Sequence, residues 1–217
     1  FIQVGHYAVH TPIQAVDEIA AKYRREGKAE VNAKYAAMVE SVDDSTGRIL
    51  DLLAELGIDE HTLVIFTSDN GGLDNGGKPT ENAPLRSGKG YAYEGGIRVP
   101  LLARWPGVIP AGRISDTPAC SIDLFPTILD AADVSLPSDR PIDGLSLLEH
   151  LESGGEEGID RDTLIWHFPH YRHAPGPYSI IRKGPWKLIL APGSVVLKNG
   201  CEKTKPVQIY NIDDDLG

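Results

Sequence analysis

Two adjacent oxygen-bearing side chains follow an apolar run, and their types suit a hard cation. Asp69 and Asn70 come directly after residues 63–66 (LVIF), Thr67 and Ser68, and lead into the pair Gly71-Gly72. Carboxylate and amide oxygens are ligands that calcium prefers, and open α/β sheets bind ligands at the carboxyl ends of their strands. An ordinary turn is the alternative for Asp-Asn-Gly. Calcium takes six to eight oxygens, so other ligands must come from elsewhere.

A basic, glycine-rich segment lies next along the chain and predicts an anion site beside the cation. Arg86 and Lys89 occur in the run RSGKG, and Arg98 follows Glu94 and two glycines. Glycines on both sides of Lys89 leave its ammonium group accessible, although a solvated loop lysine is the alternative. Arg86 is a candidate substrate contact, whereas we expect Arg98 to brace the loop through Glu94.

Histidines occur near both ends of the sequence. His6 and His10 lie close to the start, and a histidine at a strand end can donate to an anionic oxygen or act as an acid. His167 and His170 occur in the run WHFPHY, where they are candidates for a pocket rim rather than metal ligands. A packed or surface histidine is the alternative for each of them.

Composition and motifs exclude several other classes of function. The chain has 217 residues and a net charge of −10, which argues against general nucleic-acid binding. No apolar run is long enough to span a membrane, and no signal-peptide pattern is visible. The two cysteines, Cys120 and Cys201, predict neither a disulfide scaffold nor a zinc knuckle. The sequence also lacks a G-x-S-x-G elbow, a P-loop and a G-x-G-x-x-G fingerprint.

The first part of the chain alternates helix and strand. Apolar residues recur at helical spacing over residues 33–56, and Gly57 is a natural stop. Residues 61–67 then predict a buried strand, which gives a helix–strand unit typical of α/β folds. In the next helix we expect Ser121 as the N-cap and one apolar face that consists of Ile122, Phe125, Ile128 and Leu129. The remaining predicted elements are a long loop, a strand and two helices over residues 71–96, 99–106, 121–132 and 144–151.

The pattern changes after a polar, glycine-rich stretch at residues 154–162. Short strands follow, with a hairpin turn predicted at residues 183–185, and together they indicate a small antiparallel sheet. We therefore expect an α/β domain over residues 1–158 and an incomplete β subdomain over 159–217. The chain reads as a piece of a longer protein. The four predicted strands cover residues 163–168, 178–182, 186–190 and 207–212.

At this point the motifs resemble those of the type I sulfatases, almost end to end and in order. The residues that carry the resemblance are 7–12 (YAVHTP), 66–72 (FTSDNGG), 82–86 (NAPLR), 88–90 (GKG), 93–100 (YEGGIRVP), 166–171 (WHFPHY), 186–189 (WKLI) and 209–211 (IYN). The resemblance implies an alkaline-phosphatase-like αβα sandwich, partial in this chain, followed by a small C-terminal antiparallel sheet.

The resemblance also implies an activity, which is hydrolysis of aryl or carbohydrate sulfate esters by a formylglycine beside a bound calcium ion. Asp69 and Asn70 would be calcium ligands, and Lys89 and His10 would contact the sulfate. Arg86, His167 and His170 would help bind the rest of the substrate. A cation and a lysine together lower the cost of developing negative charge, in agreement with the residues themselves. A periplasmic or extracellular location is implied as well.

One departure from the family is large. The C/S-x-P-x-R signature that yields formylglycine is absent, and the nearest run, residues 135–140, has its arginine one position late. We expect the signature, further aspartate ligands and a second lysine–histidine pair before residue 1, so the chain alone should be inactive. The alternatives are a phosphodiesterase or phosphonate hydrolase, which Asn70 disfavours, and a non-catalytic protein that binds sulfated glycans. The particular ester and the oligomeric state are left open.

Overall fold

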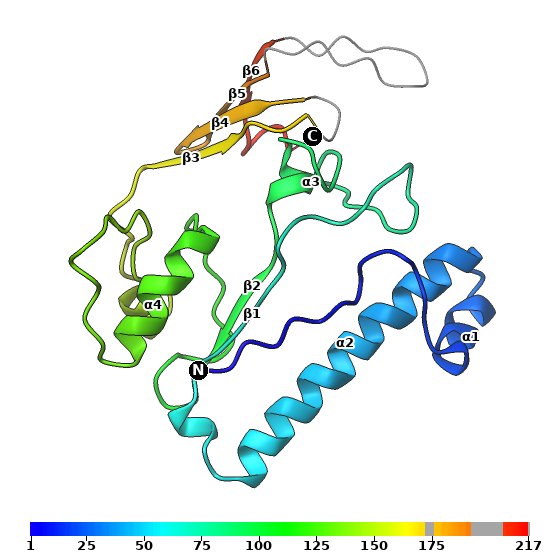
Figure 1. Ribbon diagram of the computed structural model, residues 1–217, viewed down its shortest axis with the longest axis horizontal. Coiled ribbons are helices and arrows are strands. Elements are labelled where there is room, and N and C mark those ends of the chain that lie inside the picture. The colour runs from blue at the N-terminus through cyan, green and yellow to red at the C-terminus, as the bar shows by residue number, and fades with distance from the viewer. Residues whose placement is uncertain (172–175, 192–205, 217) are drawn as a thin grey trace. The chain divides into compact units, whose positions relative to one another are not determined.

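A computed structural model describes residues 1–171, 176–191 and 206–216, so Cys201 lies outside the described residues. Contacts divide the chain into two compact units. The first contains Phe1–Leu56, Asp69–Val99 and a short C-terminal piece, and the second contains Gly57–Ser68 and Pro100–Asp214. The helices and strands are α1 (Asp17–Arg25), α2 (Glu30–Glu55), η1 (Asp59–His61), β1 (Val64–Thr67), α3 (Glu94–Ile97), β2 (Leu101–Arg104), η2 (Ser121–Asp123), α4 (Leu124–Ala131), α5 (Leu148–Glu152), β3 (Thr163–Phe168), β4 (Tyr178–Lys183), β5 (Trp186–Leu190) and β6 (Val207–Asn211) (Figure 1).

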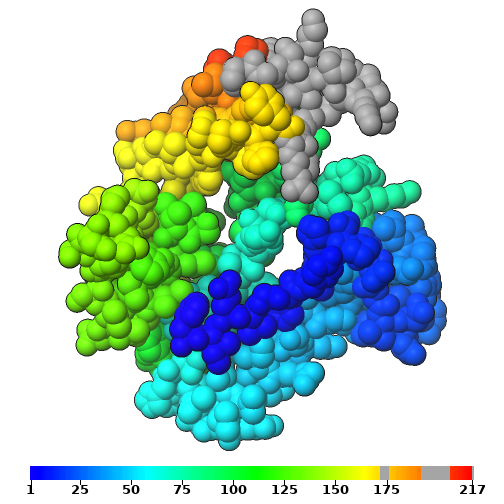
Figure 2. All heavy atoms as spheres, in the orientation of Figure 1, coloured from blue at the N-terminus to red at the C-terminus, as the bar shows by residue number. Residues whose placement is uncertain are grey.

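The first unit is built on the long helix α2, which the sequence predicts. Helix α1 packs against it through Ala20, Ala33 and Ala37, whose small, fully buried side chains allow a close approach. The apolar pattern missed α1 because Ala20 is the only buried residue on that helix. The N-terminal segment, dark blue in Figures 1 and 2, runs along α2, and His6 Nε2 lies 2.9 Å from Ser45 Oγ on that helix.

In the second unit, β1 and β2 form an antiparallel pair. The buried strand expected over residues 61–67 begins only at Val64, because residues 59–61 form a 3₁₀ turn. That strand is partly exposed rather than buried, since β1 has a single partner strand among the described residues. Trp105, just after β2, donates its Nε1–H to the carbonyl of Glu60 at 2.8 Å and so fixes the start of β1.

The C-terminal sheet has the strand order β3-β4-β5-β6, with every pair antiparallel (Figure 1). Strands β3 and β5 have the predicted bounds, and β4 and β6 differ from the prediction by one residue each. Leu164, Ile180 and Ile189 are buried in this sheet. Ile165, the residue after Leu164 on β3, and Ile209 on β6 are exposed. This four-stranded sheet is the small C-terminal antiparallel sheet that the sequence predicts.

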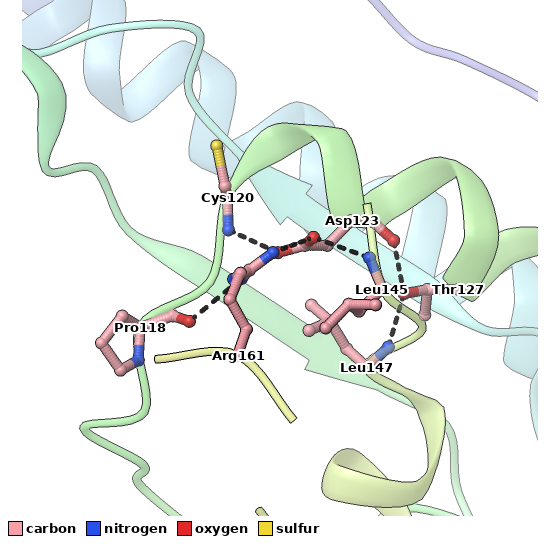
Figure 3. A network of polar contacts seen from close by, with 7 residues as sticks. All are labelled: Pro118, Cys120, Asp123, Thr127, Leu145, Leu147 and Arg161. Atoms are coloured by element: carbon pink, nitrogen blue, oxygen red, sulfur yellow. Dashed lines mark hydrogen bonds and ion pairs between the residues drawn. The ribbon is translucent and has the colours of Figure 1, made fainter. Parts of the chain in front are cut away.

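A buried ion pair joins the end of η2, just before α4, to the segment before β3 (Figure 3). The Asp123 carboxylate is fully buried and accepts two hydrogen bonds from Arg161, at 2.6 and 2.7 Å. Backbone N–H groups of Cys120 and Leu145 donate to the same carboxylate at 2.7 and 3.0 Å. Burial by itself would raise the pKa of Asp123, but these hydrogen bonds and the charge of Arg161 outweigh it and hold the pKa below its ordinary value.

The helix expected over residues 121–132 is present but differs in its cap and its buried face. Cys120, a free thiol, is the N-cap residue instead of Ser121, because Asp123 reaches back to the Cys120 amide. The expected face was wrong at Ile122 and Phe125, which are 47% and 48% exposed, whereas Ile128 and Leu129 are partly buried. The buried face instead contains Asp123, Pro126 and Thr127, and the Thr127 hydroxyl accepts from the Leu147 amide at 2.9 Å.

The two compact units are discontinuous in sequence, whereas the expected boundary between residues 158 and 159 is a single cut. That boundary stays a prediction. It does fall in the segment that precedes β3, where the chain enters the four-stranded sheet.

Candidate functional site

The candidate cation ligands lie in the loop that follows β1 in the chain. The Asp69 side chain is exposed, and it makes no hydrogen bond or ion pair with any described residue. Asn70 donates its Nδ2–H to the Gly71 carbonyl at 3.0 Å, so the amide oxygen points away from that carbonyl. The loop thus presents one carboxylate and one oriented amide, both with hard oxygen donors.

Gly71 anchors this loop against α3 by backbone contact alone. Its N–H donates to the Gly96 carbonyl at 3.0 Å. A Cβ atom placed on Gly71 would lie 1.7 Å from the Gly95 carbonyl oxygen, so no other residue fits without separating the two segments. The sequence prediction that glycines here permit a close backbone approach is confirmed.

Replacing Gly71 by alanine should therefore destabilise the first unit by about 1–3 kcal/mol or more, because the obstructing atoms belong to rigid backbone. Gly47, within α2, is the matched control, since a Cβ there meets nothing within 4 Å. Gly47→Ala should stabilise the chain by up to about 1 kcal/mol through helix propensity. Urea unfolding of both variants measures the two effects, and equal behaviour would contradict the packing described for Gly71.

Lys89 is joined to the same loop through its backbone. Its N–H donates to the Gly72 carbonyl at 3.0 Å, and Gly88 fits so tightly that a Cβ there would lie 2.3 Å from the same oxygen. The Lys89 side chain is partly buried and forms no ion pair within the described part of the chain. The backbone of Lys89 is thus held against Gly72, two residues after the candidate cation ligand Asn70, and no carboxylate among the described residues forms an ion pair with the Lys89 ammonium group.

Arg86 lies in the segment before Lys89 and stacks on an aromatic ring. Its guanidinium carbon is 4.0 Å from the centroid of the Tyr93 ring, a cation–π contact. Its carbonyl accepts from the Gly95 N–H at 2.9 Å. Arg98 contacts Glu94 through the backbone, with its N–H donating to the Glu94 carbonyl at 2.8 Å. The expected role of Arg86 in substrate binding stays a prediction.

His10 belongs to the same compact unit as Asp69, Asn70 and Lys89. Its Nδ1 lies 2.8 Å from the Thr11 carbonyl oxygen. Because a carbonyl can only accept, Nδ1 must carry a proton, and Nε2 is left to interact with another group. The ring is exposed and packs edge-on against Tyr7. Nε2 can donate to an anionic oxygen when the ring is cationic, with both nitrogens protonated.

His167 and His170 belong to the second unit, on and after β3. His167 Nδ1 is 2.8 Å from Ser179 Oγ, its partner across the β3–β4 pair, and His170 packs against the ring of Phe168. Both side chains are exposed. A substrate-binding role for these two histidines stays a prediction.

Sequence reasoning missed the part played by Asn82. Asn82 belongs to a motif that carries the family resemblance, but the sequence assigns it no role. Its carboxamide contacts the backbone of the loop after Asn70 and of the loop before Lys89. It hydrogen-bonds both the N–H and the carbonyl of Gly72, at 3.1 and 3.0 Å, and the Ser87 carbonyl at 2.9 Å. The sequence holds no signal for these contacts, because every partner is a backbone group.

The donor set fits calcium better than a softer metal. Asp69 and Asn70 supply oxygen only, and no group of three or more His, Cys, Asp or Glu side chains among the described residues could hold a metal ion. Two oxygens from this chain are short of the six to eight that calcium takes. Asp69 and Asn70 would therefore be part of a ligand set.

Comparison with known proteins identifies two family models. A model described as Sulfatase matches residues 1–134, and one described as N-sulphoglucosamine sulphohydrolase, C-terminal, matches residues 87–193. A sulfatase of Formosa agariphila is 33% identical over the whole chain, which covers 40% of that protein. Human N-acetylgalactosamine-6-sulfatase is 40% identical over 68% of the chain, and human steryl-sulfatase 36% over 93%.

Solved structures give the same result. The crystal structure of Ps i-CgsB matches 97% of the chain with a TM-score of 0.80 and 32% identity, and 43% of its own length is covered. A structure solved with its substrate D-glucosamine-2-N,6-O-disulfate matches 89% of the chain with a TM-score of 0.67 and 28% identity. The chain thus spans less than half the length of these relatives.

Proposed function

Because this chain belongs to the type I sulfatase family of the alkaline phosphatase superfamily, we propose that it is the C-terminal part of a calcium-dependent sulfatase that hydrolyses sulfate esters. One observation carries the proposal: the Gly72 carbonyl accepts from the Lys89 amide, so the candidate oxygen ligands Asp69 and Asn70 belong to one packed loop cluster with an ammonium group that forms no ion pair among the described residues. Such a cluster suits a substrate that is an anion bound next to a cation.

The chemistry of the reaction explains each role. Cleavage of the sulfur–oxygen bond leaves negative charge on the departing oxygen and on the sulfate. Bound calcium would offset part of this charge, with Asp69 and Asn70 among its ligands. Lys89 donates to a sulfate oxygen through its ammonium group. In its doubly protonated, cationic form, His10 donates Nδ1–H to the Thr11 carbonyl and gives its Nε2 proton to the departing oxygen, which leaves the neutral Nδ1–H tautomer.

The nucleophile is proposed to lie outside these 217 residues. The C/S-x-P-x-R signature is absent from the sequence, and the relatives are more than twice as long as the part that the chain matches. We therefore expect the isolated chain to be inactive and the complete protein to carry the formylglycine.

The substrate class is proposed to be a sulfated carbohydrate or aryl sulfate. Relatives named for N-acetylgalactosamine-6-sulfate and for steryl sulfate, and a neighbour solved with a disulfated glucosamine, support this range. None of the helices that the structure describes is long and apolar enough to cross a membrane. A periplasmic or extracellular location is proposed from the family.

Assays of the isolated chain and the complete protein on an aryl sulfate and an aryl phosphodiester test the proposal. We expect the complete protein to cleave the sulfate, to contain calcium by metal analysis, and to lose activity in a chelator. Stoichiometric zinc or manganese with phosphodiester cleavage would favour a phosphodiesterase or phosphonate hydrolase. Binding of sulfated glycans without turnover, in a protein that lacks the signature, would favour a non-catalytic glycan binder.

A further inference from the structure

The carboxamide of Asn82 forms a two-sided contact between the loop that carries Asp69 and Asn70 and the loop that carries Lys89. Toward the first loop, Oδ1 accepts from the Gly72 N–H at 3.1 Å and Nδ2 donates to the Gly72 carbonyl at 3.0 Å. Toward the second, Nδ2 donates to the Ser87 carbonyl at 2.9 Å. One side chain thus holds backbone two residues after Asn70 and two residues before Lys89.

Only glycine at positions 72 and 88 leaves room for this carboxamide. A Cβ on Gly72 would lie 2.7 Å from Asn82 Oδ1, and one on Gly88 would lie 2.7 Å from Asn82 Nδ2. The position also requires a donor and an acceptor together, because the partners are one N–H and two carbonyls. Aspartate has the same shape but cannot donate when ionised, so it would place negative charge against two carbonyl oxygens.

The backbone beside Lys89 needs such an anchor. Ser87 has a φ of 63°, in the left-handed region that non-glycine residues rarely adopt. A residue in that region persists only where surrounding contacts hold it, and the Asn82 bond to the Ser87 carbonyl is one of them. The Gly72 carbonyl accepts from both Asn82 and the Lys89 amide, so the contact with Asn82 and the placement of Lys89 share one atom.

We propose that Asn82 is a positioning residue that sets the place of Lys89 relative to the Asp69–Asn70 ligand pair. Within the described residues, the hydrogen bonds of its carboxamide all go to backbone groups, and in this role it has no direct contact with the sulfate. The inference rests on the proposed sulfatase function, in which the lysine and the cation act on one anion. A displacement of one loop by an ångström would weaken that joint action far more than it would weaken the fold.

Asn32 offers a matched control because its carboxamide also donates hydrogen bonds to two backbone carbonyls in the same unit. From α2, its Nδ2 donates to the carbonyls of Gly77 and Pro79 at 2.8 and 2.9 Å. Those carbonyls lie in the segment between the two site loops, but neither belongs to a site loop. Asn32→Asp should therefore disturb the unit about as much as Asn82→Asp without moving Lys89.

The experiment compares Asn82→Asp, Asn82→Ser and Asn32→Asp in the complete protein. Three quantities are measured: kcat for a sulfate ester, the calcium concentration that gives half of the thermal stabilisation, and hydrogen exchange of the Lys89 and Gly72 amides without calcium. We expect Asn82→Asp to lower kcat by about 10–100-fold, raise the calcium midpoint about tenfold and speed exchange at both amides. Asn32→Asp should leave all three near the wild-type values.

Asn82→Ser keeps a smaller donor and guards against a variant that does not fold. It should give effects in the same direction as Asn82→Asp but smaller. Equal losses in the Asn82 and Asn32 variants, or unchanged exchange at Lys89, would overturn the positioning role while leaving the sulfatase proposal intact. A wild-type protein that cleaves phosphodiesters instead of sulfates would overturn the sulfatase proposal, and the exchange measurement would still decide the role of Asn82.

Discussion

Replacing Lys89 by alanine in the complete protein is expected to lower kcat for a sulfate ester by about 10²–10³-fold. The reason is that the Lys89 ammonium group has no carboxylate partner among the described residues, so its charge is available to the developing negative charge of the reaction. The backbone bond to Gly72 does not depend on the side chain, so the loop should keep its shape. Steady-state kinetics and the melting temperature together measure the effect.

Lys78 provides the control for this change. It lies in the same glycine-rich segment with an exposed side chain, and Lys78→Ala should leave kcat unchanged. Lys89→Arg should recover only part of the lost activity, because a planar guanidinium does not occupy the place of a compact ammonium group. A Lys89→Ala enzyme within threefold of the wild type would remove the lysine from the proposed mechanism.

The sequence predicts the candidate site better than it predicts the contacts that hold it. Asp69, Asn70 and Lys89 are candidates by their residue types and by the glycines next to them. Where two backbone segments approach closely, the sequence must carry glycine, and that requirement is visible in it. Asn82 leaves no comparable mark. Its partners are backbone groups five and ten residues away, and any residue can supply a backbone carbonyl.

The fold shows the same division between periodic and non-periodic signals. The bounds of β3 and β5 follow from alternating apolar residues, and α2 from its helical spacing. By contrast, the apolar face expected over residues 121–132 was wrong at its start, because the buried side there includes Asp123 and Thr127, whereas Phe125 is half exposed. A buried carboxylate is stable there because Arg161, 38 residues later, pairs with it and two backbone N–H groups donate to it, and such contacts leave no periodic pattern in the sequence.

Removing the charge of Asp123 from its buried pair with Arg161 is expected to have the second large effect, on stability. Asp123→Asn should destabilise the second unit by about 3–5 kcal/mol, because the Arg161 guanidinium, whose side chain is 12% exposed, would be left without its carboxylate. The backbone donors of Cys120 and Leu145 would also face an amide that satisfies fewer of them (Figure 3). Asp139→Asn is the control, since the Asp139–Arg140 pair is 65% exposed on both sides and should matter little. Urea unfolding at pH 7 measures both variants.

The same pair predicts how stability depends on pH. The folded-state pKa of Asp123 lies below that of the unfolded chain, so folding favours the ionised carboxylate. Its contribution is therefore complete above the unfolded-state pKa, about 3.9, and is lost as the pH falls through the lower folded-state value. The wild type should lose more stability than Asp123→Asn when urea titrations are repeated from pH 5 down to pH 3. Parallel pH profiles for the two proteins would mean that Asp123 does not carry a depressed pKa, and the ion pair in Figure 3 would not be the source of the acid sensitivity.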